Sequence, residues 1–203
     1  DEEAEKKREC EEQERRRQIL TMKITPNSQA AFHTALQDTE KIIECGSIST
    51  GCYLSGNSKG EPRIPTRLKP NSACLLTGLL KNGEEKDRRI LGAFMVKEDF
   101  LGEHCSNGIV DGHDRYRICL PSHTALSYWD YFEHDGTFPR WGNILFKYFS
   151  NITMRKILFD MTGLFSGMEQ ESAVNEFYQY FCKINRLPME QTKSGETRGL
   201  LGS

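Results

Sequence analysis

The sequence predicts an α+β protein, with a small, mostly antiparallel or barrel-like sheet flanked by N-terminal and C-terminal helices. Three observations predict this class. The first 18 residues are highly charged and helical in pattern, apolar segments of strand length cluster between residues 45 and 120, and two amphipathic segments follow residue 150. Strands that cluster, instead of alternating with helices, are typical of α+β folds.

Length and composition limit the classes of protein that fit. The chain has 203 residues and a net charge of −2, which fits one main domain and excludes a globally basic nucleic-acid binder. There is no apolar run of the roughly 18 residues that a membrane helix needs and no signal-peptide pattern, so we expect no membrane partner. Seven cysteines without a CxxC pair predict reduced thiols in a cytoplasmic protein.

We expect three segments: a charged helical arm or linker at 1–18, a single α+β domain at 19–187 and a disordered tail at 188–203. Opposite charges four residues apart support a helix in the arm. The pairs are Glu3–Lys7, Glu11–Arg15 and Glu12–Arg16. The arm has almost no apolar stripe, and the chain begins at Asp1 and not at Met. Both features predict that the arm links to an upstream domain in a longer chain.

The elements of the domain are predicted in order from their local patterns. A helix is expected from Asn27 to Glu44, with the alternative that its second half begins a strand. Strands are expected near 47–54, 72–80 and 115–120, separated by a proline-rich loop at 57–72 and a polar connection at 102–114. The segment 89–100 is the best strand, because Ile90, Phe94 and Val96 on one side and Leu91 and Met95 on the other are all apolar, which is typical of a central strand.

Further expectations concern a glycine and the C-terminal half. Gly92, within the central strand, predicts a bulge or a bend of a barrel. Helices are expected at 123–132, 151–165 and 167–185, the second capped by Ser150 or Asn151, and 144–149 is either a short strand or a helix start.

Aromatic residues gather between Ser127 and Asn143. On a helix Trp129 and Phe132 would face the core, whereas Tyr128 and Tyr131 would lie to the side and could line a cleft. Trp141 follows Arg140 on a predicted loop, so we expect it to be exposed and to stack on a planar ligand.

Basic residues gather between positions 59 and 81, with Glu61 as the one counter-charge. They are Lys59, Arg63, Arg67, Lys69 and Lys81. Three prolines predict an extended loop, which is either a solubilising surface or a set of phosphate contacts.

Two catalytic motifs are absent from the sequence: there is no GxxxxGK[ST] and no HExxH. Metal-ligand residue types gather at His104, Cys105, Asp111, His113 and Asp114, but their spacing matches no zinc signature. With Glu98 and Asp99 they leave a metal-dependent nuclease or hydrolase as an alternative. We predict neither a metal nor another cofactor.

A resemblance adds to these expectations. The stretch KPNSACLLTGLLKNGEEKDRRILGAFMVKEDF, at 69–100, resembles the small barrels of the PUA-like superfamily, including EVE-type and YTH-type domains. The segment from about Cys45 to Asn185 also resembles an uncharacterised bacterial family that carries a zinc ribbon and a charged helix ahead of it. The first resemblance implies a reader of RNA or modified bases, which takes a base into an aromatic-lined pocket.

The resemblance implies that Trp129 and Trp141 form the walls of that pocket and that Arg63, Arg67 and Arg140 contact phosphates. Together the patterns predict a non-catalytic nucleic-acid-binding module of a bacterial defence or quality-control protein. The predicted binding residues are Trp141, Trp129, Tyr128, Tyr131, Arg63, Arg67, Lys69 and Arg140. A metal-dependent enzyme and a protein–protein adaptor that uses the charged arm remain the alternatives.

Overall fold

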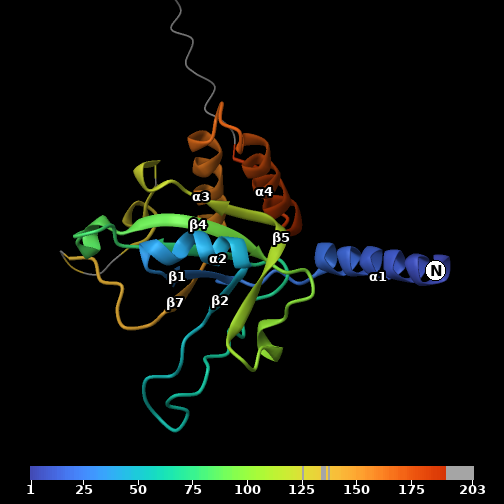
Figure 1. Ribbon diagram of the computed structural model, residues 1–203, viewed down its shortest axis with the longest axis horizontal. Helices are drawn as coiled ribbons and strands as arrows, with labels where there is room; N and C mark the ends of the chain where they lie inside the picture. Colours follow the sequence, from blue (N-terminus) through green and yellow to red (C-terminus); the bar gives the residue numbers. More distant parts are fainter. Residues whose placement is uncertain (125, 134–135, 137, 191–203) are drawn as a thin grey trace, which may run out of the picture.

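The computed structural model describes residues 1–124, 126–133, 136 and 138–190 (Figure 1). The α-helices are α1 (Glu2–Thr21), α2 (Thr39–Cys45), α3 (Asn151–Leu164) and α4 (Glu171–Ile184). The strands are β1 (Gln29–His33), β2 (Ser47–Ser49), β3 (Ala73–Gly78), β4 (Arg89–Val96), β5 (Ile109–Cys119), β6 (Leu126–Ser127) and β7 (Phe146–Phe149). Strands gathered in the middle of the chain, with helices before and after them, confirm the predicted α+β class.

The strands form one strongly curled, mixed sheet in the order β2-β5-β4-β3-β1-β7, and β6 pairs with β4 off this path. β1 and β3 are parallel, and the other neighbours are antiparallel. The sheet is curled into a half-barrel whose two edge strands, β2 and β7, are both short. Position and burial confirm β4 as the predicted central strand, since every residue from Ile90 to Val96 is buried.

Each face of the sheet has its own apolar core. On one face Leu75, Ala93 and Met95 pack against α3 and α4, which lie together above the sheet in Figure 1. On the other face Leu76 and Phe94 pack in a second cluster that includes residues of α2. Alternate residues of one strand therefore enter different cores, which is why no polar face marks the strand in the sequence.

The curl of the sheet has a local cause next to Gly92. The pairing of β3 with β4 shifts register between Leu76 and Thr77, which leaves Leu91 as the extra residue. A bulge of this kind bends a strand and increases its twist. A Cβ at Gly92 would lie 2.7 Å from the carbonyl oxygen of Ile118, so only glycine permits this close approach. The predicted bulge is confirmed.

Helix α1 projects from the body of the protein (Figure 1). Its residues are exposed up to Gln18, and of the three predicted pairs Glu12–Arg16 forms, at 2.5 Å. The last turn is anchored, because Ile19 is buried and the guanidinium of Arg186 donates to the carbonyls of Leu20 and Met22. The arm is thus tied to the body through the end of α4.

Three predicted elements are wrong. Residues 29–33 form a strand and not a helix, because β1 pairs with β3 on one side and β7 on the other; the helix begins only at Thr39. The polar stretch before Arg115 belongs to β5, which begins at Ile109. In place of the predicted helix at 123–132, the described residues form a 3-10 turn at 122–124, the short strand β6 and a second 3-10 turn at 128–130.

Other expectations hold. Helices α3 and α4 lie where they were predicted, the Ser150 hydroxyl caps α3 by accepting from the backbone N–H of Thr153, and residues 146–149 form a strand. All seven cysteines are free. Residues 188–190 have no helix or strand, and the rest of the predicted tail lies outside the described residues. In the described part of the chain, no helix combines the length and the apolarity needed to cross a membrane.

Candidate functional site

A cavity of about 770 Å³ lies at one end of the curled sheet. Residues 50–55, which follow edge strand β2, line it together with residues 141–145, which precede edge strand β7. The two loops meet closely, since a Cβ at Gly51 would lie 3.2 Å from the side chain of Leu145. Mouths of barrels are common ligand sites, and this volume is within the usual range of ligand pockets.

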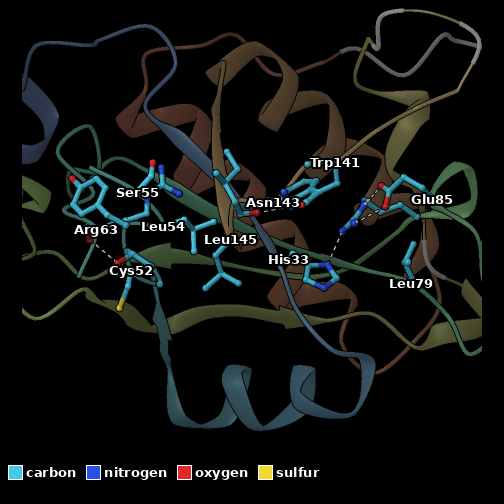
Figure 2. A pocket seen from close by; sticks show the side chains of 16 residues that line it. His33, Cys52, Leu54, Ser55, Arg63, Leu79, Glu85, Trp141, Asn143 and Leu145 are labelled. Atoms are coloured by element: carbon cyan, nitrogen blue, oxygen red, sulfur yellow. Dashed lines mark hydrogen bonds and ion pairs between the residues drawn. The ribbon is translucent and has the colours of Figure 1, made fainter. Parts of the chain in front are cut away.

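The cavity has an apolar middle and polar ends. Figure 2 shows His33, Glu85 and Trp141 toward one end and Arg63 toward the other, with Leu145 between them. A wall that combines apolar side chains with polar groups is typical of a site that orients one ligand.

Arg88 organises the polar end around His33. Its side chain is only 2% exposed, and it holds the Glu85 carboxylate through two hydrogen bonds, from Nε at 2.5 Å and from Nη2 at 2.9 Å. Nη1 contacts His33 Nδ1 at 2.9 Å and donates to the Thr77 hydroxyl at 3.1 Å. Paired this way, the buried guanidinium joins three segments that are distant in the sequence.

Trp141 forms part of the wall. Its indole N–H donates to the carbonyl of Ile144 at 2.7 Å, the guanidinium of Arg88 lies 4.4 Å from the ring centroid and the ammonium of Lys147 lies 4.8 Å from it. The expectation that Trp141 is exposed is wrong, because the residue is only 5% exposed. The ring already has two cations against it, and Tyr53, 38% exposed, is the more accessible aromatic ring that lines the cavity.

Arg63 lies at the opposite end, with its guanidinium 4.4 Å above the Phe146 ring. Its backbone is held firmly, because its N–H donates to the Gly51 carbonyl and its carbonyl accepts from the Thr50 hydroxyl at 2.6 Å. Nη1 is buried and has no hydrogen-bond partner within the described residues. A buried donor without an acceptor is costly. Because Arg63 lines the cavity, a ligand acceptor there would remove this cost once the guanidinium turns toward it.

The other basic residues predicted to bind lie outside the lining of the cavity. Arg67 is exposed above the Tyr148 ring, at 5.0 Å, on the same loop as Arg63. Lys69 is half-buried further along that loop, and Arg140 is exposed next to Trp141. Of the eight predicted residues, only Arg63 and Trp141 line the cavity.

The three remaining aromatic residues pack in the core on the α3 side of the sheet. Tyr128 is buried and stacks on Phe132, and the Tyr131 hydroxyl donates to Asp160 at 2.5 Å. Trp129 donates to the backbone carbonyl of Glu85 at 2.7 Å. This bond holds the backbone of Glu85 at the His33 end of the cavity. These residues do not form the cleft predicted from the side-facing tyrosines.

The sequence analysis missed His33, Glu85 and Arg88. His33 ends β1, in a segment that was predicted to be helical, and Arg88 looks like one more charge of the polar turn before β4. The one available signal in the sequence was the position of Arg88, a charged residue next to the apolar segment that forms β4.

The residues considered for a metal enzyme are only partly brought together. His113 Nε2 lies 3.3 Å from a carboxylate oxygen of Glu98. The Cys105 thiol is buried and donates to the Ile109 carbonyl, and Asp114 pairs with Arg117. Across residues 1–124, 126–133, 136 and 138–190, no group of three or more His, Cys, Asp or Glu residues could hold a metal ion.

Comparison of this chain with family models, with curated proteins and with solved structures found no match. The fold and the site therefore define it only as an α+β protein with a curled half-barrel sheet and a cavity at the mouth of that sheet.

The environment of His33 predicts how stability depends on pH. Burial and the neighbouring Arg88 guanidinium lower the pKa of His33, and the Glu85 carboxylate opposes them only in part. Lys147, on the neighbouring strand, adds another positive charge beside Trp141. The unfolded chain takes up a proton at His33 below about pH 6.5, before the folded protein does, so this group favours unfolding as the pH falls.

We therefore expect the contribution of His33 to the free energy of unfolding to be constant above about pH 7. Below about pH 6.5 this contribution should destabilise the fold progressively. Urea unfolding of the wild type and of His33→Gln, from about pH 5 to pH 8, measures it. The difference in the free energy of unfolding between the two proteins should change only below about pH 6.5. A difference that is independent of pH would contradict the lowered pKa.

Proposed function

We propose that this chain is a nucleic-acid-binding module that holds one unpaired nucleotide in the cavity. The observation that supports this most directly is the buried, unpartnered Nη1 of Arg63 at one end of a cavity whose other end is formed by His33 and Trp141. Arginine is a preferred ligand of phosphate, and unstacked nucleotides are bound through flat side chains and edge hydrogen bonds.

The charge around the cavity agrees with a polyanionic partner. Among the described residues that line it, Glu85 is the one acidic side chain, and Arg88 neutralises it. Outside it, Arg67 and Lys69 continue the loop from Arg63, and Arg140 precedes Trp141. We propose that these basic groups follow the backbone of the nucleic-acid strand beyond the bound nucleotide.

Tyr53 takes the stacking role that the sequence analysis assigned to the tryptophans. It lines the cavity and is exposed, whereas Trp129 and Tyr131 are engaged elsewhere. The PUA-like resemblance, a cytoplasmic location, a role in bacterial defence or quality control and an upstream domain attached to α1 remain parts of this proposal. The adaptor alternative would use the exposed surface of α1.

The test compares two arginine variants in binding to fluorescein-labelled single-stranded RNA and DNA of about eight nucleotides. Arg63→Gln should weaken binding by about tenfold or more and reduce the salt slope by about one, because a phosphate contact is lost. The matched control is Arg115→Gln, since Arg115 is an exposed arginine of β5 paired with Glu176, outside the cavity.

Fluorescence anisotropy at salt concentrations between about 50 and 200 mM gives both the binding affinity and the slope of its dependence on salt. Thermal melting checks that each variant is folded. The proposal is wrong if folded Arg63→Gln binds as tightly as the wild type, or if Arg115→Gln loses as much affinity as Arg63→Gln does.

A further inference from the structure

The His33 end of the cavity has a defined hydrogen-bonding polarity. An arginine side chain has five N–H donors and no acceptor, and it stays protonated in proteins. Because Arg88 Nη1 lies 2.9 Å from Nδ1 of His33, that ring nitrogen must accept. The single proton of the neutral imidazole then lies on Nε2. The same conclusion holds whichever ring nitrogen faces Arg88, since the facing nitrogen accepts and the other one carries the proton.

A doubly protonated ring does not fit this arrangement. It would place an N–H of His33 against an N–H of Arg88 and bring two cations into contact in a half-buried site. The Glu85 carboxylate opposes this preference only in part, because burial and the Arg88 guanidinium, which pairs with that carboxylate, have the larger effects on His33. His33 is therefore held as a donor through Nε2–H.

Nε2–H has no acceptor within the part of the chain that the structure describes, where the one hydrogen bond of the His33 side chain is that with Arg88. Figure 2 shows the His33 ring with one nitrogen at a dashed line, which is the contact with Arg88, and the other nitrogen directed away from that line. The opposite end of the cavity offers Arg63 Nη1, which is also a donor without a partner. Both ends of the cavity thus carry an N–H donor that has no partner within the described residues, and a ligand with an acceptor at each end would satisfy both.

We propose that the His33 end of the cavity selects a nucleobase whose O4 or O6 carbonyl oxygen faces Nε2–H, with the phosphate of the same nucleotide at Arg63. This inference rests on the proposed function. Uracil and thymine carry O4 and guanine carries O6, whereas cytosine and adenine carry an amino donor at the corresponding positions. For a base held through its position-4 or position-6 group, an amino group facing Nε2–H would leave two donors opposed and unsatisfied, which disfavours cytosine and adenine.

The test compares labelled oligonucleotides of uridine and of cytidine, each of about eight nucleotides, so that sugar, backbone and ring size are the same. The wild type should bind the uridine oligonucleotide about tenfold more tightly, as one hydrogen bond exchanged for one unsatisfied donor implies. Oligonucleotides of thymidine and deoxycytidine repeat the comparison on DNA.

Two variants of His33 separate its donor role from its packing. His33→Gln retains the pattern, because the amide oxygen can accept from Arg88 and the amide N–H₂ can donate to the ligand, so the preference for uridine should persist. His33→Leu fills similar space without a donor, so uridine affinity should fall to the level of cytidine. Thermal melting establishes that both variants are folded.

The outcomes distinguish this inference from the proposed function. Equal affinity for uridine and cytidine, still lost in Arg63→Gln, would overturn the base preference and leave nucleotide binding in place. A preference for cytidine, or a uridine preference that survives in folded His33→Leu, would also overturn the donor role of His33. No binding to any of the four oligonucleotides would overturn both proposals.

Discussion

Arg88→Met should lower the free energy of unfolding by about 3 kcal/mol, since it removes one partner of a buried ion pair. The Glu85 side chain is 28% exposed, so the cost lies at the lower end of the range for such pairs. Methionine has similar volume and can retain contact with Trp141, so the loss arises from the unpaired Glu85 carboxylate, the Thr77 hydroxyl and His33 Nδ1. Urea denaturation measures the change.

The neighbouring residue provides the control for this experiment. Arg89 is half-buried at the start of β4 and has no ion pair in the described part of the chain, so Arg89→Met should cost less than about 1 kcal/mol. Glu85→Gln introduced into Arg88→Met should recover part of the loss, because no uncompensated charge remains. Equal destabilisation by Arg88→Met and Arg89→Met would show that the ion pair is unimportant for the fold.

Gly102→Ala should be the most damaging of the glycine substitutions tested, at about 3 kcal/mol. A Cβ at this position would lie 1.8 Å from the Pro65 carbonyl oxygen and 2.9 Å from that of Leu68, so the loop that carries Arg63 and Arg67 must move. The Gly102 N–H also donates to Leu68, at 2.8 Å. We expect nucleic-acid affinity to fall together with stability, because the same loop positions the Arg63 guanidinium.

Gly163→Ala is the matched control, since Gly163 lies inside α3 and nothing is within 4 Å of an added Cβ. Alanine is favoured over glycine within a helix, so this variant should be more stable by about 0.5–1 kcal/mol. Calorimetric melting of both variants gives the comparison. If Gly102→Ala melts at the wild-type temperature, the close contact between Gly102 and the 65–68 backbone is wrong.

Local sequence patterns predicted the elements whose side chains alternate with a clear period. Helices α3 and α4 bury residues at helical spacing, such as Ile157, Met161, Phe177 and Phe181, and β4 is apolar on both faces. The strand β1 was missed because Ala31, Phe32, Ala35 and Leu36 fit a helical stripe equally well. Pairing with β3 and β7, which are far away in the sequence, decided its conformation.

The candidate site was accessible to sequence reasoning only in part. Arg63 and Trp141 were singled out from a basic loop and an aromatic cluster, and both line the cavity. The exposure expected for Trp141 was wrong, since the Arg88 guanidinium lies against its ring. No pattern in the sequence joins Arg88 to His33, 55 residues away.

The sequence by itself determined the α+β class, the central strand, the exposed charged arm and the two C-terminal helices, because periodicity and capping act within a few residues. Only the tertiary structure decided where the polar groups meet. Curling of the sheet brings the loops after β2 and before β7 together and closes a cavity over the buried Arg88. Hydrogen bonds between residues as far apart in the sequence as Arg88 and His33 depend on strand register. Strand register is set by packing on both faces of the sheet.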